Sequence, residues 1–319
     1  PDRDVSTHTS HSQIRRRLRR SCGRSAWSHT RAGQLSNGPV HQTPMFIALA
    51  QDAQPDLARP LAQYDDRRLL VSVGGQPAVI SNVCTHQGSR ITDRDTDRLQ
   101  CPYHGWRFDL DGRCHNHAAD LARYSVYQAA GMLFDREVNA SVAFDVGHMR
   151  LWHQRRDPVP ASVDKIMDVF LDIDHIPVVH EGVYDAVGLH HTDQITTACF
   201  DQGSVQSVQA TETDHMVPAD QRIGLAAQWL AVYPGTMIEW QPGILVVTVA
   251  RNTDPGHSQV QVFQYVDTRY QPAQWQQNLA IWEQAWQQDC AVSAGILALA
   301  SDPQEPLKRH HRQWIHHAV

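Results

Sequence analysis

The second half of the chain alternates apolar and polar residues in short runs that are separated by turn residues. Alternation with a period of two predicts strands with one buried face, and pairs such as Pro234-Gly235 and Pro242-Gly243 predict tight turns between them. Successive strands joined by short turns predict an antiparallel sheet. The expected strands are Ile195 to Phe200, Ser204 to Thr211, Leu225 to Tyr233, Thr236 to Trp240, Ile244 to Arg251 and Gln259 to Val266.

A helical period follows these strands. Residues 273–300 are rich in Gln, Ala and Trp, contain no proline, and place Trp275, Leu279, Trp282 and Trp286 at helical spacing. This spacing predicts a long helix with one apolar face. A sheet wrapped around such a helix encloses a cavity. The large residues of the strands are candidates either to line this cavity or to form ordinary core: Trp229, Tyr233, Ile238, Trp240 and Val246.

The first half of the chain carries two short segments that pair a cysteine with a histidine in the same order. They are Cys84-Thr85-His86 and Cys101-Pro102-Tyr103-His104, and the second continues into Gly105-Trp106. The residues before each segment, 77–83 and 98–100, are typical of strand ends, so each pair is expected in a loop. Two thiolates and two imidazoles suit a structural zinc ion or a 2Fe-2S cluster with imidazoles on one iron. The cluster explains two separate loops of fixed spacing better than zinc does.

A second candidate site contains Asp172, His175 and His180. On a helix Asp172 and His175 share a face, and Pro177 is expected to bend the helix so that His180 joins them. Two imidazoles and a carboxylate with open positions are the ligand set of non-haem Fe(II) oxygenases. A polar helix with incidental histidines is the alternative, since the chain has 20 histidines.

Together, the two cysteine-histidine loops and the downstream Asp-x-x-His-x-x-x-x-His pattern resemble the alpha subunit of the Rieske non-haem iron oxygenases, a family of aromatic-ring-hydroxylating and phthalate-type enzymes. The resemblance runs from about Met45 to the C-terminus. It implies an α+β chain with an N-terminal all-β Rieske domain at residues 45–155 and a helix-grip catalytic domain, an antiparallel sheet around a long helix, at residues 156–319. It also implies the cofactor ligands: Cys84, His86, Cys101 and His104 for the 2Fe-2S cluster, and His175, His180 and Asp289 for mononuclear Fe(II), with Glu283 as the fallback for Asp289.

In that family the residue at the position of Asp172 is a bridge and not an iron ligand. By the resemblance it hydrogen-bonds an iron histidine and a cluster histidine of a neighbouring subunit, here His104, so a head-to-tail homotrimer is expected. Dioxygen is the expected cosubstrate, and a small organic, aromatic molecule is expected to be hydroxylated, by mono- or dioxygenation, or oxidatively demethylated. The rival hypothesis is a Rieske electron carrier whose second domain binds a ligand without chemistry.

The chain contains no nucleotide-binding motif, so NAD(P)H is expected to supply electrons only through a separate flavin reductase, with or without a ferredoxin. The spacing of the two loops and the absence of two further cysteines distinguish the chain from other Rieske proteins. The 14 residues between His86 and Cys101 are slightly few for the family. Ser89 and Tyr103 stand where respiratory-chain Rieske proteins carry an extra disulfide, which favours the oxygenase branch.

Charge and composition limit the remaining possibilities. The net charge is −6, and residues 1–44 hold eight arginines against Asp2 and Asp4, so the rest of the chain is acidic and is not expected to bind nucleic acid. No apolar run is long enough to span a bilayer, and no secretory signal is present, so no membrane association is expected. The cysteines outside the cluster motif lack disulfide spacing, which predicts a reducing, cytoplasmic setting: Cys22, Cys114, Cys199 and Cys290.

The remaining segments are expected to play no direct part in chemistry. Residues 1–44 are interpreted as a disordered basic leader or as upstream sequence that is not native, with a transit peptide or a nucleic-acid-binding arm as less favoured alternatives. Surface or supporting roles are expected for His115, His117, His190 and His191. A solvated tail is expected for His310, His311, His316 and His317.

Overall fold

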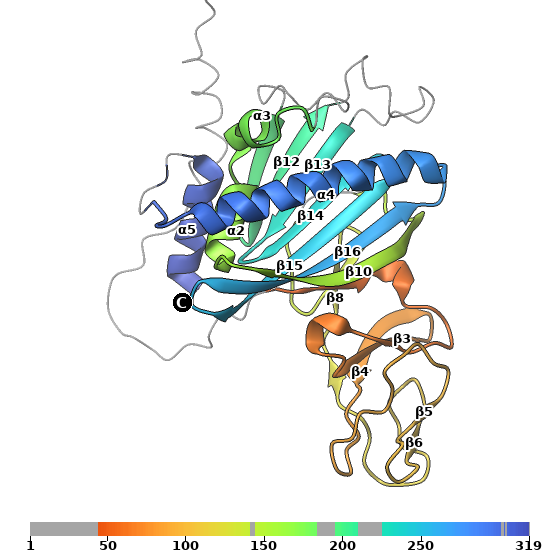
Figure 1. Cartoon of the computed structure of the whole chain (residues 1–319). Helices are drawn as coiled ribbons and strands as arrows, with labels where there is room; N and C mark the ends of the chain where they lie inside the picture. Colours follow the sequence, from red (N-terminus) through yellow and green to blue (C-terminus); the bar gives the residue numbers. More distant parts are fainter. Residues whose placement is uncertain are drawn as a thin grey trace, which may run out of the picture.

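The computed structural model describes residues 44–140, 144–183, 195–209, 225–300, 303 and 305–318. The leader up to residue 43, Cys22, His190 and His191 lie outside these residues. The described chain is built mainly of antiparallel strands, with one long helix laid across the largest sheet (Figure 1). Within the described residues, no helix is long and apolar enough to cross a membrane.

The largest sheet has seven antiparallel strands. In spatial order they are β10 (Met149–Val159), β16 (His257–Asp267), β15 (Ile244–Asp254), β14 (Thr236–Gln241), β13 (Leu225–Val232), β12 (Gly203–Gln209) and β11 (Ile195–Phe200). The strands β11 to β16 confirm the alternating pattern, with ends within three residues of those expected. The edge strand β10 was not expected, although it pairs with β16 along its length.

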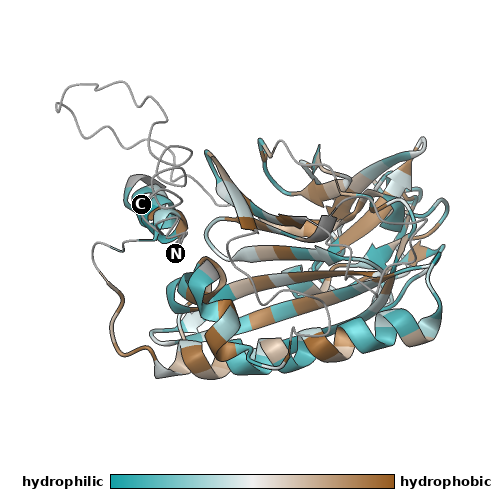
Figure 2. Cartoon of the chain, turned by 90° about the horizontal axis from the view of Figure 1, so that it is seen from above, coloured by the Kyte–Doolittle hydropathy of each residue, from teal (hydrophilic) through white to brown (hydrophobic). Residues whose placement is uncertain are grey.

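The helix α4 (Pro272–Gly295) crosses one face of this sheet, and Figure 2 shows apolar and polar residues alternating along it. It ends five residues earlier than expected. Its three tryptophans pack in one core with Tyr233 and Val246. Ile238 and Trp240 belong instead to the core on the opposite face of the sheet. Of the two alternatives left open for these residues, Ile238 and Trp240 therefore form ordinary core on the face away from the helix, because alternate positions in a strand point to opposite faces.

The cluster motifs belong to a smaller β-domain. Its four-stranded sheet contains β2 (Arg59–Pro60), β3 (Arg68–Val73), β4 (Gln76–Ser81) and β7 (Arg123–Tyr124), and a separate pair contains β5 (Leu99–Gln100) and β6 (Arg107–Phe108). The core between them contains Leu69, Val71, Ile80 and Phe108 together with the two motif cysteines. This core fixes the strand ends from which the two loops project.

A three-stranded sheet joins the two parts of the molecule. It contains β1 (Phe46–Leu49), β9 (Met132–Phe134) and β8 (Tyr127–Ala129). Every residue of β1 is buried. Phe46 and Leu49 pack against the seven-stranded sheet, and Ile47 and Ala48 pack against the β-domain. The chain then enters the larger sheet at Met149, before the boundary expected at residue 156, because β10 pairs with β16 from that residue onward.

The remaining helices are short. They are α2 (Val163–Phe170), the 3-10 turn η3 (Ile173–His175), α3 (Ile176–Val179) and the C-terminal helix α5 (Pro306–Ala318). In α5, Leu307 is buried in the same core as the tryptophans of α4. His311 is completely buried against Tyr233, and Nδ1 of His310 lies 3.2 Å from the Tyr233 hydroxyl. The expectation of a solvated histidine tail is therefore wrong for His310 and His311.

Burial of His311 makes the stability of the fold depend on pH. Burial and the positive charge of Arg312 lower the pKa of His311 to about 3, so the folded protein keeps this ring neutral where the unfolded chain protonates it. Stability is therefore lost as the pH falls below the unfolded pKa of about 6.5, by about 2 kcal/mol at pH 5. We expect urea unfolding of the His311→Leu variant to lose about this much pH dependence between pH 7 and 5. An unchanged dependence would show that His311 is not buried in solution.

Candidate metal centres

The two motif loops in the β-domain share one backbone arrangement. In each loop the cysteine N–H donates to the carbonyl of the residue five positions later, at 2.8 Å in both cases. Gly88 and Gly105 each donate back to the cysteine carbonyl at 2.9 Å, and both have φ of +72°. This left-handed conformation is favourable for glycine alone among common residues. The sequence therefore folds Cys84 and Cys101 into equivalent positions.

The side chains of the two loops form a sulfur pair and an imidazole pair. Cys84 and Cys101 are each 2% exposed, form no disulfide, and hydrogen-bond to one another. His86 and His104 are exposed, with ring centroids 4.6 Å apart. A cluster places its two sulfur ligands on one iron and its two imidazoles on the other, whereas zinc gathers four donors at one point. Among the described residues these four donors do not gather around one point, so their arrangement fits the cluster.

The surroundings of the loops affect the thiols and the imidazoles differently. Burial raises the pKa of the Cys84 thiol. Burial also opposes ionisation of Cys101, but backbone N–H groups of the same loop outweigh it and lower the pKa of this thiol. Trp106 stacks on His86 at 4.9 Å and on His117 at 4.0 Å between ring centroids. The imidazole pair is thus supported on one side by an aromatic stack and open to solvent on the other.

The second candidate site is assembled from η3, α3 and α4. His175 ends η3, His180 follows the last residue of α3, and Asp289 lies on α4. The Nε2 atoms of His175 and His180 are 3.0 Å apart. Oδ1 of Asp289 lies 3.3 Å from Nε2 of His175 and 3.2 Å from Nε2 of His180. Three donor atoms therefore converge at one buried point.

The local backbone differs from the expected bent helix. Asp172 precedes η3, and His175 is on this 3-10 turn, so the two do not lie on one regular helix. Pro177 stands in the first turn of α3, where its missing N–H costs nothing, so it starts a helix and does not bend one. The single turn of α3 brings His180 back towards His175.

Hydrogen bonds on the far side of each imidazole set its tautomer. Nδ1 of His175 contacts the carbonyl of Asp172, and Nδ1 of His180 lies 2.9 Å from Oε1 of Gln288. Both oxygens only accept, so both Nδ1 atoms carry a proton and both Nε2 atoms present lone pairs. Oδ1 of Asp289 is buried without a hydrogen-bond donor. Three electron-rich atoms about 3 Å apart repel one another unless a cation lies between them, so this donor set fits a divalent metal such as Fe(II).

Electrostatics of the site agree with this arrangement. Burial alone lowers the pKa of His180, but the adjacent Asp289 carboxylate outweighs burial and holds this pKa above its usual value. Burial alone raises the pKa of Asp289, but the two imidazoles outweigh it and hold this pKa below its usual value. Asp289 is therefore ionised at neutral pH, as a metal ligand must be.

The fallback ligand lies elsewhere on α4. Glu283 pairs with Arg155 at 2.9 Å and belongs to no group of potential metal ligands among the described residues. Asp172 also lies outside the converging donors. Its carboxylate accepts from Lys308 at 2.7 Å and from the N–H of Asp174 at 3.1 Å, while its carbonyl contacts the ring of His175.

A buried carboxylate that belongs to none of the sequence motifs lies beside this site. Glu239 of β14 accepts from the indole N–H of Trp282 at 3.0 Å and from Gln241 at 2.7 Å. Burial, together with the nearby charge of Asp289, raises the pKa of Glu239 to about 7. Because Trp282 lies two turns before Asp289 on α4, this bond helps to fix the helix on the sheet. The available signal was that Glu239 is the only charged residue between positions 224 and 250.

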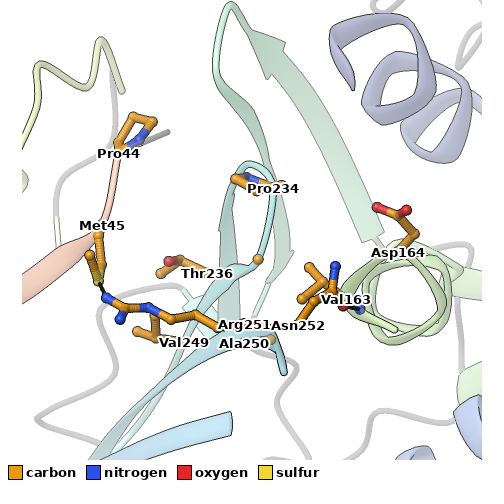
Figure 3. Close-up of a pocket in the computed structure, with 11 residues that line it drawn as sticks. Pro44, Met45, Val163, Asp164, Pro234, Thr236, Val249, Ala250, Arg251 and Asn252 are labelled. Carbon is orange, nitrogen blue, oxygen red and sulfur yellow. Dashed lines mark hydrogen bonds between the residues drawn. The ribbon is translucent and has the colours of Figure 1, made fainter. Parts of the chain in front are cut away.

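A cavity of about 260 Å³ lies away from both candidate centres, where α2 begins beside the turn between β13 and β14. Figure 3 shows Met45 and Arg251 meeting at one side of it and Val163 and Asp164 at the other. None of the candidate metal ligands lines this cavity. We therefore assign it no part in the chemistry of the metal centres.

Comparison with known proteins shows a domain family for part of the chain and a fold for most of it. Residues 43–127 match the model of the Rieske [2Fe-2S] domain. The structure resembles that of the quaternary ammonium Rieske monooxygenase CntA with a TM-score of 0.64 and 15% identity, covering 86% of this chain and 88% of that one. The chain has the fold of a Rieske oxygenase alpha subunit. This likeness confirms the expected fold class of a Rieske β-domain followed by an antiparallel sheet around a long helix.

Sequence relatives match shorter stretches. Methylxanthine N1-demethylase NdmA of Pseudomonas putida is 21% identical over 157 residues, which cover 41% of this chain and 44% of the relative. The carnitine monooxygenase oxygenase subunit of Escherichia coli (strain K12) is 27% identical over 152 residues, which cover 37% of this chain and 41% of the relative. The aligned part of this chain thus spans less than half the length of these relatives.

Proposed function

We propose that the chain is the oxygenase component of a Rieske non-haem iron oxygenase. The observation that carries this proposal is the convergence of His175, His180 and Asp289, with both imidazoles held in the metal-binding tautomer, in a chain that also has a Rieske domain. An electron carrier with a non-catalytic second domain needs no such buried donor set.

Each group of residues has a defined task in this proposal. Cys84, Cys101, His86 and His104 hold the 2Fe-2S cluster. When bound, the cluster and the ferrous ion supply single-electron transfer and dioxygen activation. Asp172 and Gln288 keep the two imidazoles of the iron site oriented through their Nδ1 protons. The packing of α4 against the sheet keeps Asp289 buried and limits the access of water to the site.

Electron transfer is proposed to run between subunits. In Figure 1 the β5 and β6 pair, which flanks one cluster loop, lies at the opposite end of the molecule from α3, where the iron ligands gather. One chain therefore does not bring its own cluster beside its own iron. A head-to-tail homotrimer, in which Asp172 accepts from His104 of the partner subunit, supplies the missing contact. The same arrangement is consistent with a related Rieske monooxygenase structure reported to give insights into inter-subunit electron transfer.

The proposed substrate is a small organic molecule with an oxidisable C–H bond beside nitrogen. The named relatives act on methylxanthine and carnitine, and a further relative is a glycine betaine monooxygenase oxygenase subunit. We propose hydroxylation at such a carbon, which leads to oxidative demethylation where that carbon is an N-methyl group. An aromatic ring in the substrate, as in a methylxanthine, fits the same proposal.

Electrons are proposed to come from NAD(P)H through a separate flavin reductase, with or without a ferredoxin, in the cytoplasm. The exposed His86 and His104 rings provide a surface where such a donor can approach the cluster. Turnover by the purified chain with NADH alone would argue against a separate reductase.

Metal analysis tests the proposal directly. We expect reconstituted protein to contain about three irons and about two acid-labile sulfides per chain, because a 2Fe-2S cluster and one mononuclear ferrous ion account for them. Plasma emission spectrometry and a sulfide assay provide the two numbers. Two irons with two sulfides would support the electron carrier instead. Labelled dioxygen supplied with l-carnitine or caffeine as probe substrates then reports whether oxygen enters the product.

A further inference from the structure

The C-terminal helix α5 meets the segment before the iron ligands through two ion pairs. Lys308 and Arg312 are four residues apart and share a face of α5, and Asp168 and Asp172 have the same spacing. Nζ of Lys308 lies 2.7 Å from Oδ2 of Asp172, and Arg312 contacts Oδ1 of Asp168. Two positive charges on one face of α5 thus pair with two carboxylates in the segment that precedes His175.

Both ion pairs are sheltered from solvent. The side chains of Lys308, Arg312 and Asp168 are 12%, 13% and 11% exposed, and that of Asp172 is 23% exposed. Fully exposed ion pairs contribute little, whereas removal of one partner from a sheltered pair leaves the other charge poorly solvated. The docking of α5 has an independent apolar basis in Leu307, which is buried against the core of α4.

The two ion pairs differ in the further contacts that their aspartates make. The carboxylate of Asp172 also accepts from the N–H of Asp174 at 3.1 Å, and its carbonyl contacts Nδ1 of His175. All three contacts are made by Asp172. One oxygen of its carboxylate binds Lys308, the other accepts from the N–H of Asp174 in η3, and its backbone carbonyl contacts Nδ1 of His175. Asp168 lies one turn earlier, within α2. Only the Lys308 pair is directly linked to an iron ligand.

We propose that Lys308 is a positioning residue of the iron site, which fixes Asp172 so that η3 presents Nε2 of His175 to the metal. This inference rests on the iron site proposed above. Partners that orient metal ligands from behind commonly change metal affinity by 10- to 100-fold when they are removed. The helix α5 then forms part of the metal centre as well as part of the core.

The test compares Lys308→Met with Arg312→Met, which removes the neighbouring ion pair on the same helix face. Protein that keeps its cluster but has lost the mononuclear iron to a chelator is titrated with Co(II), and the visible absorption of bound Co(II) gives Kd. We expect Lys308→Met to weaken Co(II) binding about tenfold or more, and Arg312→Met to change it by less than about twofold. Lys308→Arg, which keeps the charge and donors, is expected to restore binding.

Two further measurements separate positioning from stability and from the proposed function. Tm should fall by similar amounts in Lys308→Met and Arg312→Met, while the electron paramagnetic resonance spectrum of the ferrous nitric oxide adduct should broaden only in the former. Equal weakening of Co(II) binding by both variants, or no weakening by Lys308→Met, would overturn the inference alone. In the unaltered protein, Co(II) is expected to give a spectrum that His180→Ala abolishes. Absence of such a spectrum in the unaltered protein would contradict the proposed iron site itself.

Discussion

Asp289→Ala is expected to leave about two irons per chain, both in the cluster, and to lower product formation by about a thousandfold or more, because dioxygen activation depends on the mononuclear metal. Asp289 provides the only carboxylate oxygen that converges with His175 and His180 among the described residues. Alanine also removes the negative charge that would offset the positive charge of a metal ion held by the two imidazoles. Iron analysis together with the visible spectrum of the cluster measures both parts of this result.

Glu283→Ala is the matched control for this experiment. Glu283 lies on the same helix, is partly exposed, and pairs with Arg155. We expect Glu283→Ala to keep all of the iron and to lose only a small amount of stability, as is usual for partly exposed ion pairs. Loss of iron in Glu283→Ala, with retention in Asp289→Ala, would show that Glu283 is the third ligand.

Asp172→Asn is expected to keep about three irons per chain and a normal cluster spectrum, yet to slow product formation by about a hundredfold, as misplacement of a group in a catalytic path often does. Asparagine has nearly the same shape and still offers an oxygen to Lys308. It lacks the negatively charged carboxylate that is proposed to accept a hydrogen bond from His104 of the partner subunit. The measurement is the rate at which the reduced cluster is reoxidised after mixing with dioxygen.

Asp168→Asn is the control for Asp172→Asn. It removes a similar charge from a similar ion pair one turn earlier, next to Arg312. Its cluster should be reoxidised at nearly the rate of the unaltered protein. Fast reoxidation in Asp172→Asn at full iron content would remove Asp172 from the electron path and leave the iron site itself intact.

The large sheet and the long helix were predictable because local patterns determine them. Alternation over Ile244 to Arg251 and the helical spacing of Trp275, Trp282 and Trp286 reflect burial of one face, which a single sequence records. Which face of the sheet each apolar residue occupies was harder to predict. Ile238 and Trp240 are as apolar as Tyr233, and only the second core, formed with the three-stranded sheet, shows that they point away from α4.

The candidate cluster ligands follow from local spacing, since each loop contains its own pair, and so do His175 and His180, whereas Asp289 was expected only from the family resemblance. The supporting residues do not follow from local spacing. Lys308 reaches Asp172 from 136 positions away, and nothing in a basic, histidine-rich segment distinguishes a docked helix from a solvated tail. The 3-10 turn at His175 was missed for a similar reason, because Asp172, which accepts from the N–H of Asp174 in this turn, is itself held by the distant Lys308.

The middle layer formed by β1, β8 and β9 has a mechanical consequence. The strand β1 is buried on both sides. Phe46 and Leu49 face the seven-stranded sheet, and Ile47 and Ala48 face the β-domain, so the strand forms a rigid connection and not a hinge. The β-domain therefore cannot swing towards the candidate iron site of the same chain without exposing these apolar residues to water. On the proposed function, we therefore expect electrons to pass only between separate copies of the chain, so that activity requires their association.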